Sequence, residues 1–301
     1  MNKASLPSCE LSYTVFGQGR VNLVIEIALG ATAGEWWHIA EHLSEKYTVL
    51  LYERSKNARV ERTPLTIANE LHELLKAIPC EEQIIIVAHS QGGLYAQQFA
   101  RLYPQMVKGV VLIDPLSAND SYYKKVLTPK EQKQSGFDKT GNLVIMKHLS
   151  ALHLGFVIKA FMKKAPPFYY YHNFSQDAEE YILTAITVPS LYTSSLEEYR
   201  LSHMEQYTLP LKDKLDFPDI PLVLITHSSE FSIKEIIEFG RVSSEFAAKV
   251  EMLWQSLMKE YLTFSNVNQF IQARNSGHFI HLTEPELIDD GLFWIERNTI
   301  K

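Results

Sequence analysis

The stretch IIIVAHSQGGLYAQQFA, residues 84–100, places one serine between a run of β-branched residues and an amphipathic segment. The apolar run is typical of a strand buried on both faces of a sheet, and the segment after the serine favours a helix. A sharp turn between them admits only small side chains two positions before and after its apex, where Ala88 and Gly92 flank Ser90. The pattern predicts a nucleophile elbow with Ser90 at the carboxyl edge of a sheet and the N–H of Gln91 available to an oxyanion. The alternative is that Ser90 only caps the following helix.

Composition and charge limit the classes to which this protein can belong. The chain has 301 residues, 46% hydrophobic and 21% charged, with a net charge of −6. Such a chain can build a sizeable core, and the absence of a basic stripe argues against a nucleic-acid partner. Cys9 and Cys80 form no disulfide or zinc pattern. Residues 1–13 lack the apolar stretch of a signal peptide, and no apolar run approaches the ~20 residues of a membrane span. We therefore expect a cytoplasmic protein without a membrane span.

Strand-like and helix-like patterns alternate along much of the chain, which predicts an α/β fold with a mostly parallel, doubly wound sheet. Thr283 and Glu286 form a capping-box pattern with Pro285 between them, so the last helix is expected to begin near Thr283. The expected strands are 23–27, 48–52, 84–88, 109–113, 222–226 and 270–274, and the other expected helices are 35–45, 66–78 and 91–103.

The alternation stops between about residues 117 and 216. This segment is helix-leaning, aromatic and interrupted by prolines, and it contains no evident strand of the main sheet. It is interpreted as a helical cap over the end of the sheet, inserted into a core made of residues 1–116 and 217–301. The alternative is an independent second domain, because a segment of ~100 residues can fold alone.

A serine hydroxyl needs a base, and eleven histidines are available. His278 lies in a loop of small residues between the last expected strand and the last helix, so it can reach Ser90 at the same sheet edge. The alternative is a structural loop histidine. His89, beside the serine, points to the other side of the turn and is expected to be structural. His281 could pair with His278 on a metal, but no third ligand has suitable spacing, so no metal is expected.

Together, AHSQGG after a strand, then VVLIDP, a helical insertion and SGHFIHLTEPEL resemble the α/β-hydrolase superfamily, and in particular its capped bacterial serine hydrolases and esterases. The resemblance covers nearly the whole chain, with the insertion as its least specific part. It implies the chain order serine, acid, histidine, an oxyanion hole after the first core strand, and acyl-transfer hydrolysis without a cofactor. Relatives with dehalogenase or epoxide-hydrolase activity attack with a carboxylate, whereas Ser90 stands at the nucleophile position here.

The resemblance also indicates the second oxyanion donor. Many members carry His-Gly at the end of the first core strand, and the next residue donates its N–H. In VIEIALGATAGEWW, residues 24–37, that pair corresponds to Ile27 and Ala28, so the donor would be Leu29, with Gly30 or Ala31 as alternatives. The expected histidine and glycine are both missing. A main-chain N–H does not depend on its side chain, and Gly30 can supply the conformational freedom of the turn.

The acid of the triad has two candidates. The family usually has an aspartate after the strand LVLIT, but this chain reads THSSEF there, and Glu230 is the only carboxylate of that loop. Some members place the acid after the preceding strand, where this chain has Asp114. Either carboxylate would orient the imidazole and stabilise its charged form. A dyad without an acid, or a purely structural Asp114, remains a third possibility.

The sequence thus favours a serine hydrolase acting on a small or medium hydrophobic ester, lactone or thioester. The insertion is rich in aromatic residues, including the stretch FYYYHNF at residues 168–174 and Phe156, Phe161 and Tyr192. These rings would roof an apolar pocket or simply pack the insertion onto the core. Peptidase, carbon–carbon bond hydrolase and perhydrolase activities use the same triad. A second hypothesis, supported by the missing His-Gly pair, is a small-molecule receptor or signalling module of the same fold with weak or no catalysis.

Overall fold

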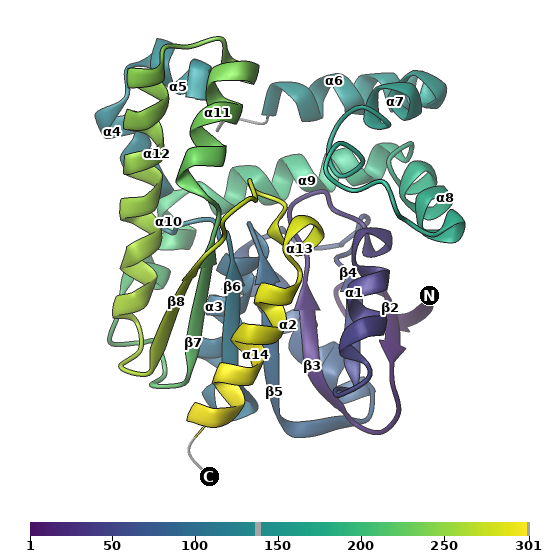
Figure 1. The fold of residues 1–301 in the computed structure, drawn as a ribbon. Helices are drawn as coiled ribbons and strands as arrows, with labels where there is room; N and C mark the ends of the chain where they lie inside the picture. Colours follow the sequence, from purple (N-terminus) through teal and green to yellow (C-terminus); the bar gives the residue numbers. More distant parts are fainter. Residues whose placement is uncertain (136–139, 300–301) are drawn as a thin grey trace.

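The computed structural model describes residues 1–135 and 140–299. Eight strands form one sheet in the order β1-β2-β4-β3-β5-β6-β7-β8 (Figure 1). The pairs β1/β2 and β2/β4 are antiparallel, and all other neighbours are parallel. The strands are Asn2–Ser5 (β1), Glu10–Phe16 (β2), Val21–Glu26 (β3), Val49–Glu53 (β4), Cys80–His89 (β5), Val107–Ile113 (β6), Leu222–Thr226 (β7) and Asn268–Gln272 (β8).

Helices cover both faces of this sheet. Figure 1 shows α1 and α14 on one face, with α2 and α3 on the other. Outside the segment between β6 and β7, the α-helices are Trp37–Leu43 (α1), Pro64–Ala77 (α2), Gly92–Leu102 (α3), Ser229–Gly240 (α11), Ser244–Lys259 (α12), Ile280–Thr283 (α13) and Glu286–Asn298 (α14). The predicted mostly parallel, doubly wound fold is therefore confirmed.

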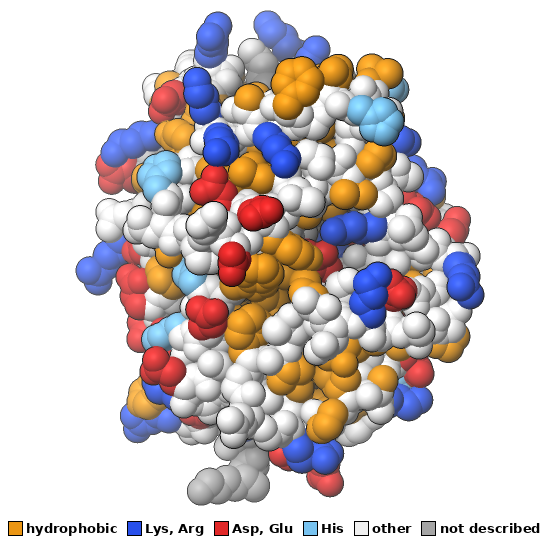
Figure 2. All heavy atoms as spheres, turned by 90° about the vertical axis from the view of Figure 1, so that its right-hand side faces the viewer, with side chains coloured by type: hydrophobic (Ala, Val, Ile, Leu, Met, Phe, Trp, Pro, Cys, Tyr) orange, Lys and Arg blue, Asp and Glu red, His pale blue; other side chains and the backbone are white. Residues whose placement is uncertain are grey.

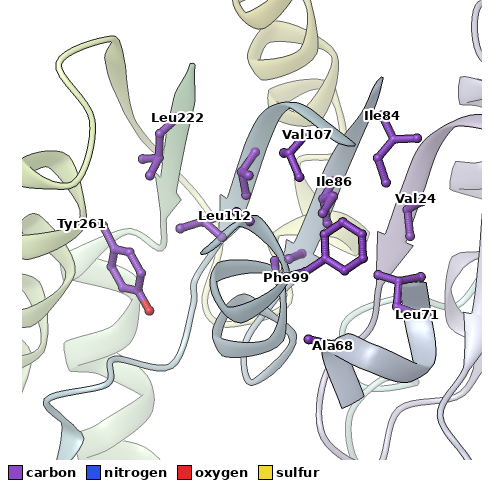
Figure 3. Close-up of a cluster of buried hydrophobic side chains, with 14 of the residues drawn as sticks. Val24, Ala68, Leu71, Ile84, Ile86, Phe99, Val107, Leu112, Leu222 and Tyr261 are labelled. Carbon is purple, nitrogen blue, oxygen red and sulfur yellow. The ribbon is translucent and has the colours of Figure 1, made fainter. Parts of the chain in front are cut away.

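The core explains the continuous apolar strands. In β5, Ile84 and Ile86 belong to the cluster beneath α2 and α3, whereas Ile85 and Val87 belong to the cluster beneath α1 and α14. Because successive side chains of a strand point to opposite faces, a strand covered on both sides must be apolar at every position. Figure 3 shows the first cluster, in which Phe99 of α3 lies among side chains of the sheet and of α2.

In its described residues, the segment between β6 and β7 consists of helices joined by loops and contains no strand. Figure 1 shows α6, α7, α8 and α9 above the carboxyl ends of the central strands. Its α-helices are Tyr123–Val126 (α4), Pro129–Ser135 (α5), Thr140–Ala151 (α6), Gly155–Met162 (α7), Gln176–Ala185 (α8), Pro189–Ser202 (α9) and Glu205–Thr208 (α10). Short 3₁₀ helices lie at Ala33–Trp36, Pro104–Met106, Asp120–Tyr122, Leu209–Lys212 and Glu260–Thr263.

Three details differ from the sequence predictions. Strands β1 and β2 were not anticipated, and β8 ends at Gln272, two residues before the expected end. Thr283 does not cap the last helix. Its hydroxyl bonds instead to Ser276 Oγ at 2.6 Å, because a separate short helix ends at Thr283 and α14 begins only at Glu286.

Within the described residues, no helix combines the length and apolar character that a membrane span requires.

Candidate active site

Ser90 lies between β5 and α3 with a φ of +55°. A non-glycine residue in this left-handed region is strained by about 1–3 kcal/mol, so the surrounding structure must hold it. Its N–H donates to the carbonyl of Ile113 at 3.0 Å, and its own carbonyl accepts from the N–H of Leu116 at 2.8 Å. These bonds tie the turn to the end of β6.

Small residues around Ser90 are required by close packing. A Cβ atom on Gly92 would lie 2.5 Å from the carbonyl oxygen of Glu26, and one on Gly93 would lie 2.6 Å from Cβ of Pro115. Ala88 is fully buried on the other side of the turn. Close packing therefore leaves no room for a side chain at Gly92 or Gly93 beside Ser90.

His278 reaches Ser90 from the loop after β8. Its Nε2 lies 3.0 Å from Ser90 Oγ, although the two residues are 188 positions apart in the chain. Its Nδ1 lies 2.6 Å from Oδ2 of Asp114. Since a carboxylate only accepts, Nδ1 carries the hydrogen and Nε2 is left to accept from the Ser90 hydroxyl. The structure thus brings together the serine, the histidine and one of the two candidate acids.

The loop that carries His278 is held from two sides. Glu284 accepts from the N–H groups of Arg274 and Asn275 at 3.1 and 2.9 Å. His89 Nε2 lies 2.9 Å from the carbonyl oxygen of His278, to which it donates. Burial, with the nearby His278 imidazole, lowers the pKa of His89 to about 3, so its ring stays neutral. His89 therefore supports the loop, in agreement with the structural role expected from the sequence.

The two candidate acids lie in different environments. Asp114 directly follows β6 with a φ of +45°, is buried, and contacts His278 directly. Burial alone would raise its pKa, but the adjacent imidazoles of His227 and His278 hold the pKa well below its usual range. Glu230 lies in the first turn of α11 with 81% of its side chain exposed, and it pairs with Lys234 at 2.8 Å. The geometry favours Asp114 as the partner of His278.

A second imidazole reaches the same aspartate. His227 directly follows β7, near the position where the family resemblance led us to look for an acid, and its Nδ1 lies 2.9 Å from Asp114 Oδ2. Its Nε2 lies 2.9 Å from Oε2 of Glu251 on α12. The sequence analysis missed both residues. The sequence carries a usable signal for His227, because a histidine stands at the carboxyl end of a buried strand. It carries no such signal for Glu251, which is a buried position on an amphipathic helix.

The candidate oxyanion loop follows β3. Glu26 pairs with Ala88 across β3 and β5, so Leu29 and Ser90 follow parallel strands at the same sheet edge. Leu29 lies in a turn in which Gly30 has a φ of +67°, the conformational freedom expected of this glycine. Gln91 is the residue before α3, and its side-chain amide donates to Tyr95 and, at 3.3 Å, to Ser202 of α9.

Arg54, which directly follows β4, holds the first residues of this loop in place. Its guanidinium donates to the carbonyls of Ile27 and Ala28 at 2.7 and 2.8 Å. It also pairs with the buried carboxylates of Glu26 at 2.6 Å and Glu198 of α9 at 2.9 Å. This buried network, which the sequence did not reveal, joins the loop before Leu29 to the helical segment above the sheet.

His281 is placed differently from the metal ligand considered in the sequence analysis. It is fully buried, and its ring stacks on Trp36 at 4.3 Å between centroids. Burial, followed by the neighbouring histidines, lowers its pKa well below the usual range. In the part of the chain that the structure describes, no three His, Cys, Asp or Glu side chains are grouped so that they could hold a metal ion.

Known proteins share this architecture. A family model described as the alpha/beta hydrolase fold matches residues 22–148. An AB hydrolase superfamily protein of Gibberella zeae is 24% identical over 289 residues, which cover 88% of this chain and 83% of that protein. The chain is therefore similar to α/β hydrolases and has the α/β-hydrolase fold.

Two solved structures extend the comparison. Est816, described as an enzyme that degrades N-acyl homoserine lactones, superposes with a TM-score of 0.62 at 14% identity, covering 97% of this chain and 99% of its own. The epoxide hydrolase CorEH superposes with a TM-score of 0.67 at 17% identity, covering 98% of each chain. At these identities the likeness is one of fold.

Proposed function

We propose that this protein is a serine hydrolase that cleaves carboxylic esters, lactones or thioesters through an acyl-enzyme on Ser90. The observation that carries the proposal is the unbroken hydrogen-bonded series from Ser90 Oγ through His278 to Asp114, with separations of 3.0 and 2.6 Å. A positioned imidazole activates a serine hydroxyl, and a buried carboxylate behind it stabilises the imidazolium that forms.

In the proposed cycle, Ser90 Oγ attacks the substrate carbonyl while His278 Nε2 takes its proton. The main-chain N–H groups of Leu29 and Gln91 hold the developing oxyanion. His278 then protonates the leaving alcohol or thiol as its bond to carbon breaks. A water molecule, deprotonated by His278, then attacks the acyl carbon. His278 gives this proton to Ser90 Oγ as the acyl–oxygen bond breaks, which releases the acid and restores the serine hydroxyl.

Residues 117–216 are proposed to form a cap over this site. A contact that supports this is the ring of Tyr170, which stacks on Phe279 at 5.1 Å, next to His278. Tyr170 also donates a hydrogen bond to Glu235 of α11. These rings provide an apolar wall beside the imidazole, which is why hydrophobic acyl groups are the proposed substrates.

Three other aromatic residues of the segment lie elsewhere. Phe156 and Phe161 are 70% and 57% exposed, and Tyr192 is buried in a separate cluster between the helices of the segment. Figure 2 shows exposed hydrophobic and basic side chains interspersed at the top of the molecule, where these helices lie. The proposed apolar wall therefore includes Tyr170, which belongs to the predicted aromatic stretch FYYYHNF, together with Phe279, and it does not include Phe156, Phe161 or Tyr192.

The test is hydrolysis of p-nitrophenyl acetate, butyrate and octanoate, together with a γ-lactone. Ser90→Ala is expected to abolish turnover while the circular dichroism spectrum stays unchanged. Ser256→Ala, which removes an exposed hydroxyl on α12, is the matched control and should keep full activity. Full activity in Ser90→Ala would overturn the proposal. Activity absent from the native protein as well, with thermal stabilisation by small ligands, would favour the receptor hypothesis.

A further inference from the structure

Asp114 is bound by His227 as well as by His278. The main-chain N–H of His227 donates to Oδ1 at 3.0 Å, and Nδ1 of its ring lies 2.9 Å from Oδ2. The opposite ring nitrogen, Nε2, lies 2.9 Å from Oε2 of Glu251. A continuous series of polar contacts therefore runs from Ser90 through two imidazoles and two carboxylates to α12.

The proton count of this series determines the charge of His227. Carboxylate oxygens only accept hydrogen bonds, so an imidazole that bridges Asp114 and Glu251 needs a hydrogen on each nitrogen. Both separations fall in the range of charge-assisted bonds. Burial opposes the charge, but the two carboxylates outweigh it and raise the pKa of His227 to about 10. The ring also stacks on Trp254 at 4.0 Å, which suits a cation.

Glu251 then restores the charge that catalysis requires. Asp114 and a charged His227 alone would be a neutral pair and would do little to stabilise an imidazolium at His278. With Glu251 ionised, the group behind His278 carries one net negative charge, as a single buried aspartate would. The His227 imidazole opposes the effect of burial on Glu251 and keeps the pKa of this carboxyl low.

We propose that His227 and Glu251 are positioning residues of the catalytic site: His227, as an imidazolium, holds the Asp114 carboxylate toward His278, and Glu251 supplies the compensating negative charge. The proposal rests on the proposed function of Ser90, His278 and Asp114. It assigns a role to a histidine that stands beside the usual place of the triad acid.

Other polar groups face this series and enter its pH dependence. Gln272 of β8 donates to the His227 carbonyl, and Gln255 of α12 donates to Glu251. Tyr123 of α4 lies in the field of Asp114 and Glu251. Glu235 of α11 is a further carboxyl near both imidazoles, and burial raises its pKa although the Tyr170 hydroxyl and the imidazoles oppose this. In a Glu235→Gln variant, the titration of His227 and His278 can therefore be measured without that of Glu235.

The direct test is an NMR titration of the full chain labelled with ¹⁵N-histidine. In the native protein, both ring nitrogens of His227 are expected to carry hydrogen from about pH 6 to about pH 9. Glu251→Gln should lower the pKa of His227, because one of the two carboxylates that raise it is gone. Glu245→Gln, which removes an exposed carboxylate from the first turn of the same helix, is the matched control and should change nothing. A neutral His227 at pH 7 in the native protein would overturn the proposal, whatever the enzyme hydrolyses.

The second readout is the pH profile of kcat/KM for an ester that the native enzyme cleaves. Glu251→Gln removes a negative charge behind His278 and should move the acid limb to lower pH by about 0.5–1 pH unit, whereas His227→Gln removes a positive charge and should move it to higher pH. A merely structural role would lower the rates without opposite displacements, and that result would contradict the proposal. If the native protein cleaves no ester, the proposed function fails, while the NMR titration still decides the charge of His227.

Discussion

Arg54 Nε donates a hydrogen bond of 2.9 Å to Oε2 of Glu198, joining the end of β4 to α9. Both side chains are buried, and the same guanidinium holds the carbonyls of Ile27 and Ala28 just before Leu29. One ion pair thus links the helical segment above the sheet to the loop proposed to bind the oxyanion.

Glu198→Ala is expected to destabilise the protein. The substitution leaves Arg54 and the nearby Arg62 with one carboxylate fewer in a buried setting, and an undercompensated buried charge costs about 3 kcal/mol of unfolding free energy. Urea unfolding measures this loss. As a control, Glu230→Gln breaks an exposed pair with Lys234 and should leave the unfolding free energy unchanged. Equal unfolding midpoints for native protein and Glu198→Ala would show that the pair contributes nothing.

Asp114→Asn is expected to lower kcat by about 10³-fold or more, because the imidazolium formed at His278 loses its carboxylate partner. Glu230→Gln should leave kcat unchanged, since this side chain points to solvent. Steady-state kinetics on the best ester of the p-nitrophenyl series compares the two variants. If Glu230→Gln lowered kcat by orders of magnitude and Asp114→Asn did not, Glu230 would be the acid of the triad.

Gly92→Ala tests the packing of the elbow. Its Cβ would lie within 2.5 Å of the Glu26 carbonyl oxygen, so the turn or β3 must move, at a cost of about 1–3 kcal/mol. A large loss of activity should accompany the change, because Ser90 is two residues away. Gly141→Ala on α6 is the matched control: its Cβ would meet nothing within 4 Å, and alanine is the better helix former, so stability should stay equal or rise. Equal effects of the two substitutions in thermal unfolding would contradict this account.

The charge of His227 also predicts how stability depends on pH. Its pKa is raised from 6.5 to about 10 in the folded protein, so the stabilisation is complete below the unfolded pKa and is lost as pH rises toward 10. Between about pH 7.5 and 9 the folded state holds one proton that the unfolded state has released, which lowers the unfolding free energy by up to about 1.4 kcal/mol per pH unit. His89 and His281 have lowered pKa values, so their contributions fall at lower pH.

Urea unfolding at several pH values in this window measures that slope. His227→Gln should flatten it, and an identical slope in the variant would show that His227 does not hold the proton.

Much of the arrangement could be predicted because it follows from strand order. Ser90, Asp114 and His278 each follow a parallel strand, and the carboxyl ends of such strands meet at one edge of the sheet. The positions of Gly92 and Ala88 follow from local sterics at the elbow. These constraints act within short stretches of sequence, so a single chain reveals them.

The remainder depends on contacts between distant elements. In the sequence, Glu251 has the pattern of any position on an amphipathic helix. The packing of α12 against β7 brings it to His227. Arg54 and Glu198 are 144 positions apart, and their pairing requires the path of the segment between β6 and β7. The capping pattern at Thr283 was misleading because its hydroxyl is used by the His278 loop instead.

The most direct measurement of the central claim is labelling with a fluorophosphonate probe, followed by peptide mass spectrometry. We expect rapid covalent modification at Ser90, much slower modification of the same serine in Asp114→Asn, and normal labelling in Glu245→Gln. Modification at another serine, or none under conditions that label a known serine esterase, would contradict this claim.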